Sequence, residues 1–272
     1  MTAVARPQRR TGSTSLNWLV GLIVPVALIA AWQIAKSAGA LPYTNVPSPL
    51  QIWDAAVTLA RNGQLQGNFG HTIAVCLIGW AIGSSIGAAA GVALGLSRRV
   101  WSYSMASVDV LRSIPAISFI PIAVIIFLQT TTMEVSIAAR VSIWPVAVST
   151  MTGVAGVSAE HRELAASLRL NWRARVAKLA LPTALPKIQV ALRLALSGAL
   201  VLAIVAEIVG NPHGVGYALV NAQQQSEPAE MFAYILLTGV VGLILNGLLT
   251  LAYRRLAPGF HLAESRRTGN GN

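Results

Sequence analysis

The sequence has few charged residues and only one cysteine. Charged side chains make up 11% of the 272 residues, whereas soluble domains average about 25%. Apolar residues make up 54%, and the mean hydropathy is +0.62. This composition excludes an ordinary soluble domain and predicts a chain that crosses a membrane repeatedly. The lone Cys76 excludes a disulfide framework within the chain, and we expect it to pack as a small hydrophobic residue.

Motifs for catalysis and nucleotide binding are also missing. The four histidines lie on separate segments, without a carboxylate or thiol at ligand spacing, so we predict no metal site, cofactor or catalytic residue. No Gly-x-x-x-x-Gly-Lys-Ser/Thr loop occurs, so the chain cannot hold ATP as P-loop proteins do. Any nucleotide-driven work must come from another polypeptide.

Six apolar runs predict an all-α, multi-pass membrane protein with six transmembrane helices. They span about residues 18–34, 71–96, 102–128, 135–154, 188–209 and 231–253. Basic residues cluster in the connections on one side, and only Lys36 and Arg61 lie on the other. The positive-inside rule therefore places both termini in the cytosol. The same clustering in short segments argues against nucleic-acid binding, despite a net charge of +11.

The polar segments divide the chain. Residues 1–15 and 258–272 are predicted cytosolic tails, and residues 16–257 form the six-span domain with a cytosolic loop at 155–187. An amphipathic helix from Pro49 to Arg61 is expected in the first external segment, and residues 211–230 form a polar external loop. Glycines recur at every fourth position from Gly79 to Gly95, which predicts close packing against another helix.

The third span is predicted to break at Ser113–Pro115 and again near Pro121. Broken helices in membranes are tolerated where the freed carbonyl groups line a cavity or pack on protein. Three ionisable residues lie within or near spans and by default face the bundle interior or a pathway. Together with Pro115 they form our candidate translocation path: Arg112, Pro115, Arg140 and Glu207.

Each ionisable residue also has a structural alternative. Arg140 attracts an anionic substrate, or it pairs with a carboxylate such as Glu134 or Glu207. Glu207 contacts substrate, or it makes a hydrogen bond across the bundle. Arg112 lies on the path, or it anchors the cytosolic side.

The segment from Ser158 to Arg193 carries two glutamates, a histidine and seven basic residues, so it lies outside the bilayer. Ser158 and Asn171 are predicted N-caps of two short helices, and the second helix is expected to end at Pro182. Such a helix pair either lies on anionic lipid or docks into a protein groove, and its small residues between leucines favour a protein partner.

These residues resemble a known family. The run Glu163-Leu164-Ala165-Ala166, followed by Leu181-Pro182-Thr183-Ala184-Leu185-Pro186, is similar to the cytoplasmic EAA loop of binding-protein-dependent ABC importer permeases. Arg112-Ser113-Ile114-Pro115 resembles the family's Arg-x-Ile-Pro break. The residues Val205-Ala206-Glu207 and Gly214-Val215-Gly216-Tyr217 resemble the nitrate, sulfonate, taurine and bicarbonate branch.

The resemblance implies a type I ABC importer permease in the plasma membrane. It implies a homodimer that works with two copies of a separate ATPase and an extracytoplasmic solute-binding protein, and it makes the loop a coupling helix. The implied ATPase-coupling residues are Glu163, Leu164, Ala165, Ala166, Leu168, Arg169, Leu181 and Pro182. Arg169 departs from the family pattern, which usually has glycine at this turn, where a left-handed backbone is easier for glycine.

The predicted function is therefore import of a small solute, first a sulfonate, nitrate or similar anion. A pyrimidine or vitamin precursor is the alternative within the same class. An ion-coupled secondary transporter is the alternative from another class, although the sequence offers only Glu207 as an intramembrane carboxylate and no inverted repeat.

Overall fold

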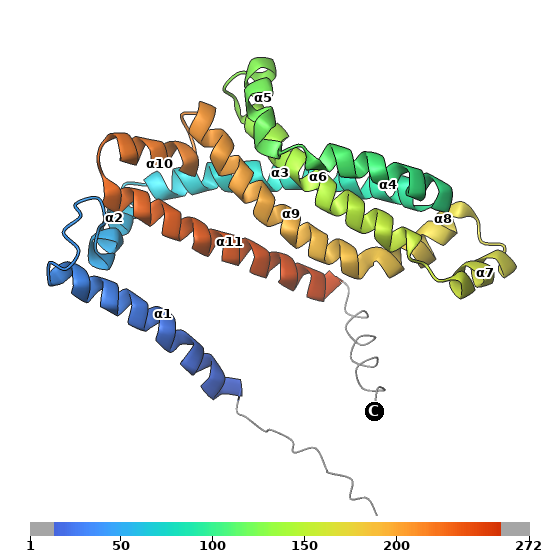
Figure 1. The fold of residues 1–272 in the computed structure, drawn as a ribbon, viewed down its shortest axis with the longest axis horizontal. Coiled ribbons are helices and arrows are strands. Elements are labelled where there is room, and N and C mark those ends of the chain that lie inside the picture. The colour runs from blue at the N-terminus through green and yellow to red at the C-terminus, as the bar shows by residue number, and fades with distance from the viewer. Residues whose placement is uncertain (1–13, 257–272) are drawn as a thin grey trace, which may run out of the picture.

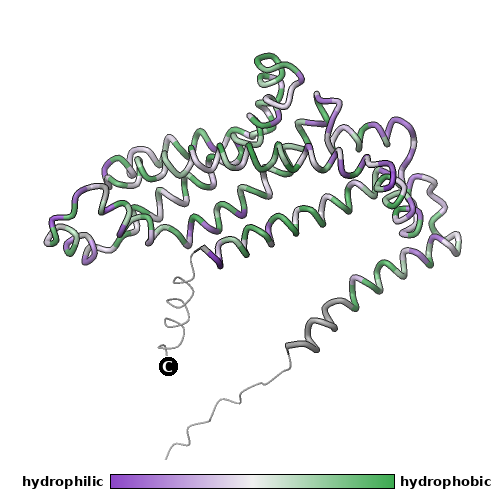
Figure 2. The backbone as a smooth tube through the Cα atoms, turned by 180° about the vertical axis from the view of Figure 1, so that it is seen from behind, coloured by the Kyte–Doolittle hydropathy of each residue, from purple (hydrophilic) through white to green (hydrophobic). Residues whose placement is uncertain are grey.

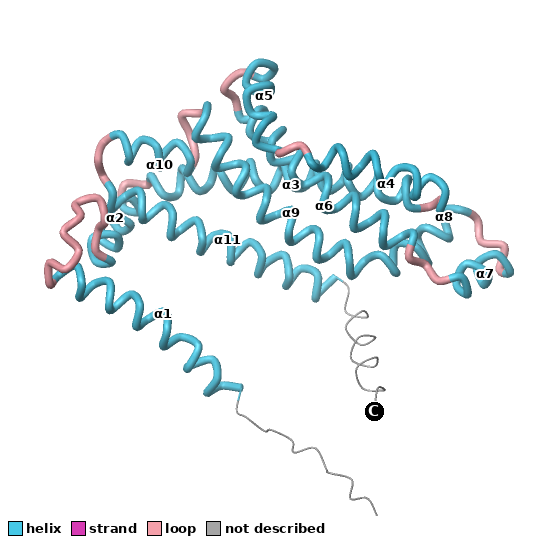
Figure 3. Tube along the Cα trace, viewed as in Figure 1, coloured by secondary structure: helices cyan, strands magenta, loops and turns pink. Residues whose placement is uncertain are grey.

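The structure, a computed structural model, describes residues 14–256 as helices joined by short loops (Figure 3). Outside this description are the side chains of residues 14–22, Arg98, Ala159, Arg162, Ala166 and Arg173. The predicted tails 1–15 and 258–272 also lie outside it, apart from residues 14 and 15. No strand occurs in residues 14–256, so the all-α prediction is confirmed for this range.

In chain order the elements are α1 (Thr14–Ser37), α2 (Pro49–Arg61), α3 (Gln64–Gly95), α4 (Arg98–Ser113), the 3₁₀ turn η1 (Ala116–Phe119), α5 (Ile120–Phe127), α6 (Thr131–Ala155), α7 (Ala159–Ser167), α8 (Trp172–Arg175), the π-helical turn η2 (Val176–Ala180), α9 (Leu181–Gly210), α10 (Val215–Gln224) and α11 (Pro228–Leu256). The long helices form an elongated bundle, with α2 and α10 at one end and α7 at the other (Figure 1). We call these the α10 end and the α7 end.

Four of the described helices are long and apolar enough to cross a membrane: α3, α6, α9 together with η2, and α11. A fifth crossing results if α4 to α5 counts as one bent span. Hydrophobic residues predominate along the length of these helices, while hydrophilic residues gather at the two ends of the bundle (Figure 2). In α1 only Ile23–Ser37 enters this comparison, because the side chains before Ile23 lie outside the description. Four or five of the six predicted spans are thus accounted for.

The core of the bundle is made by α3, α6 and α9. Val75 and Cys76 of α3 pack with Ala138 of α6 and with Leu196, Ala199, Leu200 and Ala203 of α9. Cys76 is fully buried in this cluster, which confirms its predicted packing role. By contrast α1 touches α2 and, through Trp32 on Phe232, the start of α11, and then diverges from the bundle (Figure 1).

Glycines bring α3 against α6. The five buried glycines are Gly79, Gly83, Gly87, Gly91 and Gly95. A Cβ atom at Gly79 would lie 2.5 Å from the Cβ of Ala138, and one at Gly91 would lie 2.6 Å from the carbonyl oxygen of Ala147. Any side chain here would therefore collide with α6, which confirms the predicted close packing.

The third predicted span is broken as expected. Helix α4 ends at Ser113, the chain passes through Ile114 and Pro115, and the segments on either side are bent by 72°. At Pro121 the chain changes from η1 to α5, with the proline in the first turn of α5. That position needs no intrahelical amide donor, so the proline is tolerated.

The predicted end of a helix at Pro182 is wrong. Helix α8 continues through η2 into α9, and the Leu181 amide donates to the Val176 carbonyl, five residues back. Pro182 lies in the first turn of α9. The wider π turn makes room for the proline ring and the proline needs no amide partner there, so the chain remains helical.

The predicted external loop at residues 211–230 is also corrected, because it contains α10. Val215, Ala218 and Ala222 form the buried face of this helix. Val215 and Ala218 pack with Ile52 of α2 and Tyr234 of α11. The surrounding glutamines hide this short apolar face in the sequence. Helix α2 has the predicted bounds, and Ser48 and Gln51 form a capping box at its start.

Substitution of Gly91 by alanine is expected to destabilise the fold. The new methyl group would meet backbone atoms of α6, and overpacking costs about 1–3 kcal/mol. Thermal unfolding of the purified protein in detergent should show a lower midpoint than wild type. Gly239→Ala is the matched control, since a Cβ at Gly239 meets nothing within 4 Å. Equal midpoints for the two variants would contradict the close packing of α3 on α6.

Candidate functional site

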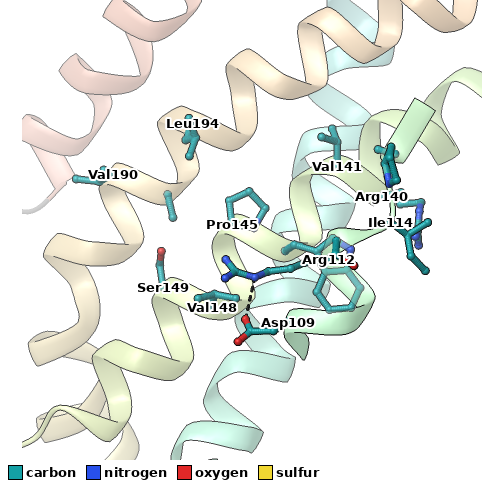
Figure 4. A pocket seen from close by; sticks show the side chains of 15 residues that line it. Asp109, Arg112, Ile114, Arg140, Val141, Pro145, Val148, Ser149, Val190 and Leu194 are labelled. Carbon is teal, nitrogen blue, oxygen red and sulfur yellow. Dashed lines mark ion pairs between the residues drawn. The ribbon is translucent and has the colours of Figure 1, made fainter. Parts of the chain in front are cut away.

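A cavity of about 750 Å³ lies between the broken helix pair α4–η1, α6 and α9 (Figure 4). Its walls include Asp109, Arg112, Pro115, Arg140, Trp144, Pro145, Ser149 and Leu194. Cavities of about 300–1,000 Å³ hold small-molecule ligands in proteins. Three of the four residues predicted for the translocation path therefore share one cavity.

Two arginines and one aspartate line the cavity and give it a net positive charge. Arg112 Nε lies 2.9 Å from Asp109 Oδ1, and both side chains are about half exposed. Such an exposed pair contributes little to stability. Arg140 has a different environment, because its Cζ lies 3.3 Å from the centroid of the Phe119 ring. The buried Nε of Arg140 has no hydrogen-bond partner among the described residues.

An unpaired buried donor is costly, and the aromatic ring only partly offsets that cost. A bound anion would supply the missing acceptor. The pairing of Arg140 with Glu134 or Glu207, which the sequence left open, is not found in residues 14–256. Both carboxylates instead bond elsewhere, at the α10 end.

Glu207 is not part of the cavity wall. Its carboxylate is buried, with Oε1 accepting from Thr72 Oγ1 at 2.7 Å and Oε2 accepting from the Gly216 amide at 2.8 Å. These are hydrogen bonds across the bundle, one of the two roles that the sequence left open. Since Gly216 lies in the first turn of α10, the carboxylate also faces the positive end of the helix dipole.

Helix α7 presents an exposed apolar edge at the far end of the bundle. Leu164 is 57% exposed and Leu168 is 62% exposed, and Glu163 beside them is also exposed. Ala165 is buried and faces a small cavity beside Gly95 and Leu179. One side of α7 thus rests on the bundle while the other is open to a partner. Ala166 lies in α7, but its side chain is outside the description.

The caps predicted for this segment are present. Ser158 Oγ accepts from the His161 amide at 3.4 Å, and Asn171 Oδ1 accepts from the Ala174 amide at 2.9 Å. Of the remaining coupling residues, Leu181 is exposed and Pro182 is half-buried at the start of α9. The residues proposed for coupling therefore gather at the α7 end.

Arg169 adopts a left-handed backbone, with φ +48°. The Leu170 amide donates to the Ala165 carbonyl at 3.1 Å, which spans the turn that Arg169 makes after α7. A hydrogen bond of this kind, from Leu170 back to Ala165 across the end of α7, is the Schellman motif. The motif favours glycine at its left-handed position, which Arg169 occupies here. The sequence thus puts an arginine where the backbone suits glycine, at a cost of about 1–2 kcal/mol.

A family profile described as "Binding-protein-dependent transport system inner membrane component" matches residues 66–261. The match covers the cavity, α7 and α10. The chain belongs to this family. It is an inner-membrane transport permease of the ABC importer class.

Curated relatives are similar in sequence to this permease over most of its length. The permease is 30% identical over 249 residues to a putative aliphatic sulfonates transport permease protein, SsuC, of Bacillus subtilis, covering 92% of this chain and 90% of that protein. It is 30% identical over 264 residues to the bicarbonate transport system permease protein CmpB of Synechococcus elongatus, covering 89% and 94%. It is 26% identical over 258 residues to the nitrate import permease protein NrtB of a Synechocystis strain, covering 90% and 93%.

Solved structures support the fold. An inward-facing conformation of the MetNI methionine ABC transporter matches with a TM-score of 0.57 at 20% identity, over 71% of this chain and 93% of that one. An amino acid ABC transporter solved with histidines matches with a TM-score of 0.55, over 69% and 92%. At this identity the likeness concerns the fold alone.

Sequence reasoning missed a second group of functional side chains at the α10 end of the permease. His71, Glu134 and Glu207 come from α3, α6 and α9, and one ligand atom of each lies within 4.8 Å of the others. His71 and Glu134 are 63 residues apart, so spacing gave no signal for their contact. The sequence did offer one sign that these three residues meet, since all three are ionisable and lie at the same end of their spans.

Arg169→Gly is expected to stabilise the end of α7. It removes the strain of a left-handed arginine, by about 1 kcal/mol, so amide hydrogen exchange in α7 should slow about fivefold. Arg175→Gly is the control, because Arg175 is α-helical and glycine there should speed exchange locally. Faster exchange in α7 of the Arg169→Gly permease would contradict the assigned strain.

Proposed function

We propose that this permease imports a small anion as one of two identical membrane subunits, driven by a separate ATPase and supplied by an extracytoplasmic solute-binding protein. The observation that carries the anion assignment is the buried, unpaired Nε of Arg140 in the wall of the 750 Å³ cavity. Arg112 is also in the wall, but its charge is offset by Asp109, so the net positive charge of the cavity comes from Arg140. Sulfonate, nitrate or a similar anion is the proposed substrate.

The relatives support this substrate class by their names, which specify aliphatic sulfonates, bicarbonate and nitrate. These solutes are small anions, and the cavity is large enough for each. A pyrimidine or vitamin precursor remains the second candidate, favoured by the apolar wall that Trp144, Val190 and Leu194 contribute.

The proposed topology has six spans and cytosolic termini. Residues 16–257 form the membrane domain in this proposal, with α1 as the first span and the α4–α5 pair as the third. The asymmetry of basic residues supports it, because those of the α7 end outnumber Lys36 and Arg61 near the α10 end. The α7 end is then cytosolic, which puts α7 within reach of an ATPase.

Coupling in this proposal runs through α7. Leu164 and Leu168 are exposed in the described chain and would fill a groove on the ATPase, with Glu163 at its edge. Ala165 is buried in the wall of a small cavity that the ends of α3 and α6 and the η2 turn also line, so a movement of α7 would be transmitted to these elements. When ATP draws the two ATPase subunits together, the helices that wall the cavity would change their tilt and open it outward.

Arg140→Gln is expected to lower the maximal uptake rate of an anionic substrate by about tenfold or more. The substitution removes a charge that would pair with the anion in transit, and 1.4 kcal/mol corresponds to a factor of ten. Uptake of labelled taurine or nitrate by cells carrying the complete system measures this. Arg193→Gln, an exposed arginine of α9 outside this cavity, should transport normally. Equal rates in both variants would exclude Arg140 from the path.

Competition between substrates tests the two candidate classes. If the cavity takes anions, uptake of a labelled anion should be inhibited by unlabelled taurine or nitrate and unaffected by a pyrimidine precursor.

A separate test removes the ATPase. Uptake that persists without it would favour an ion-coupled secondary transporter and overturn the proposal.

Glu163→Lys is expected to abolish ATPase association or substrate-stimulated ATP hydrolysis while membrane insertion stays normal. The change reverses a charge at the exposed edge of α7 without altering the buried side of the helix. Co-purification and ATPase assays of the reconstituted complex measure it. Glu227→Lys makes the same charge change on an exposed residue at the α10 end and should leave both readouts unchanged. Unaltered stimulated hydrolysis in Glu163→Lys would rule out α7 as the docking element.

A further inference from the structure

Three ionisable side chains meet at the α10 end, away from the cavity that holds Arg112 and Arg140. His71 Nε2 lies 2.8 Å from Glu134 Oε2, and a ligand atom of Glu207 lies within 4.8 Å of both residues' ligand atoms. Glu134 is completely buried, Glu207 is 1% exposed, and the His71 side chain is 20% exposed. His71 is therefore the most exposed member of the group, and Glu207 also borders a second pocket lined by Gln129 and Tyr217.

The charges of this cluster are not balanced by the described residues. With both carboxylates ionised, the cluster carries a net negative charge even if the imidazole is protonated. Glu134 Oε1 is buried without a hydrogen-bond partner among the described residues. A buried, unpaired carboxylate oxygen is strongly unfavourable, so the cluster favours a species that neutralises it, either a metal cation or a proton.

We propose that His71, Glu134 and Glu207 bind a divalent transition-metal ion of the Zn²⁺ type. One imidazole nitrogen and two carboxylate oxygens are ligands that Zn²⁺ takes, with bonds of about 2.0–2.2 Å. Tetrahedral bonds of that length separate the ligand atoms by about 3.4 Å. The observed separations, from 2.8 Å up to at most 4.8 Å, bracket that value, so metal binding would require the side chains to rotate toward it. A divalent ion would neutralise the two carboxylates with the imidazole uncharged.

Surrounding groups hold one ligand in place. Thr72 Oγ1 donates to Glu207 Oε1 and accepts from the Val215 amide at 2.9 Å, while the Gly216 amide donates to Oε2. A Cβ atom at Gly214 would collide with the Glu207 carboxylate, so glycine makes the room for it. Outer partners of this kind orient metal ligands, and each carboxylate oxygen has a second lone pair left for a metal.

The proposed ion would connect the three core helices, because its ligands come from α3, α6 and α9. It lies at the end opposite α7. Binding there would oppose any movement that separates these helices at the α10 end, and by mass action it would stabilise the folded permease.

Cobalt is the probe for this site, since tetrahedral Co²⁺ replaces Zn²⁺ and absorbs visible light. We expect the full-length permease, purified with its ATPase in lipid nanodiscs and stripped with chelator, to bind one Co²⁺ per chain with a tetrahedral spectrum that Zn²⁺ abolishes. His71→Asn and Glu134→Gln should eliminate the spectrum. Thr72→Val should weaken affinity about tenfold to a hundredfold. Zn²⁺ should also raise the thermal midpoint of the wild-type complex.

Glu227→Gln is the matched control, because it removes an exposed carboxylate at the same end and should bind Co²⁺ as wild type does. Absence of saturable Co²⁺ binding to the wild type overturns the proposal without requiring any variant to fold. So does binding that His71→Asn and Glu134→Gln leave intact. An infrared band of a protonated carboxylic acid in the chelated wild type that Zn²⁺ does not remove would assign a proton, instead of a metal, to the cluster. None of these outcomes bears on anion transport through the Arg140 cavity.

Discussion

The close contact of α3 with α6 is the constraint on which the other features depend. Lipid is as apolar as leucine, so helices in a membrane associate through close packing and polar contacts. The glycines from Gly79 to Gly95 let α3 lie directly on the backbone of α6. This contact fixes Arg140 of α6 in the cavity wall and brings His71 of α3 to Glu134 of α6.

The two ends of the bundle use their charged residues differently. At the α7 end, charge and exposed leucines lie on the surface, where a partner subunit can reach them. At the α10 end, Glu134 and Glu207 are buried, and Thr72 and the first turn of α10 hold Glu207. The cavity between these ends has two arginines and one aspartate, and Asp109 pairs with Arg112, so that Arg140 is left as its unpaired charge. Since charge within a membrane is expensive, these three different environments point to three distinct tasks.

Arg169 shows how a family pattern and a backbone conformation inform each other. The resemblance places a glycine at this turn, and the backbone there has φ +48°. The turn after α7 therefore keeps the geometry that suits glycine even with arginine present. The hydrogen bond from Leu170 to Ala165 offsets part of the strain. The geometry of α7 is maintained at a local cost in stability.

Periodicity and local chemistry in the sequence determined the long apolar helices, the glycine stripe, the break at Ser113–Pro115, the helix from Pro49 to Arg61 and the caps at Ser158 and Asn171. Each depends on residues a few positions apart, and interactions of such short range can be predicted from the sequence pattern. The helical passage through Pro182, the helix α10 and the His71–Glu134–Glu207 cluster were decided by tertiary structure. Three features arise only when the chain is packed, because their stabilising partners are distant in sequence. They are the π turn, the short apolar face that α2 and α11 bury, and the contacts across 63 or more residues.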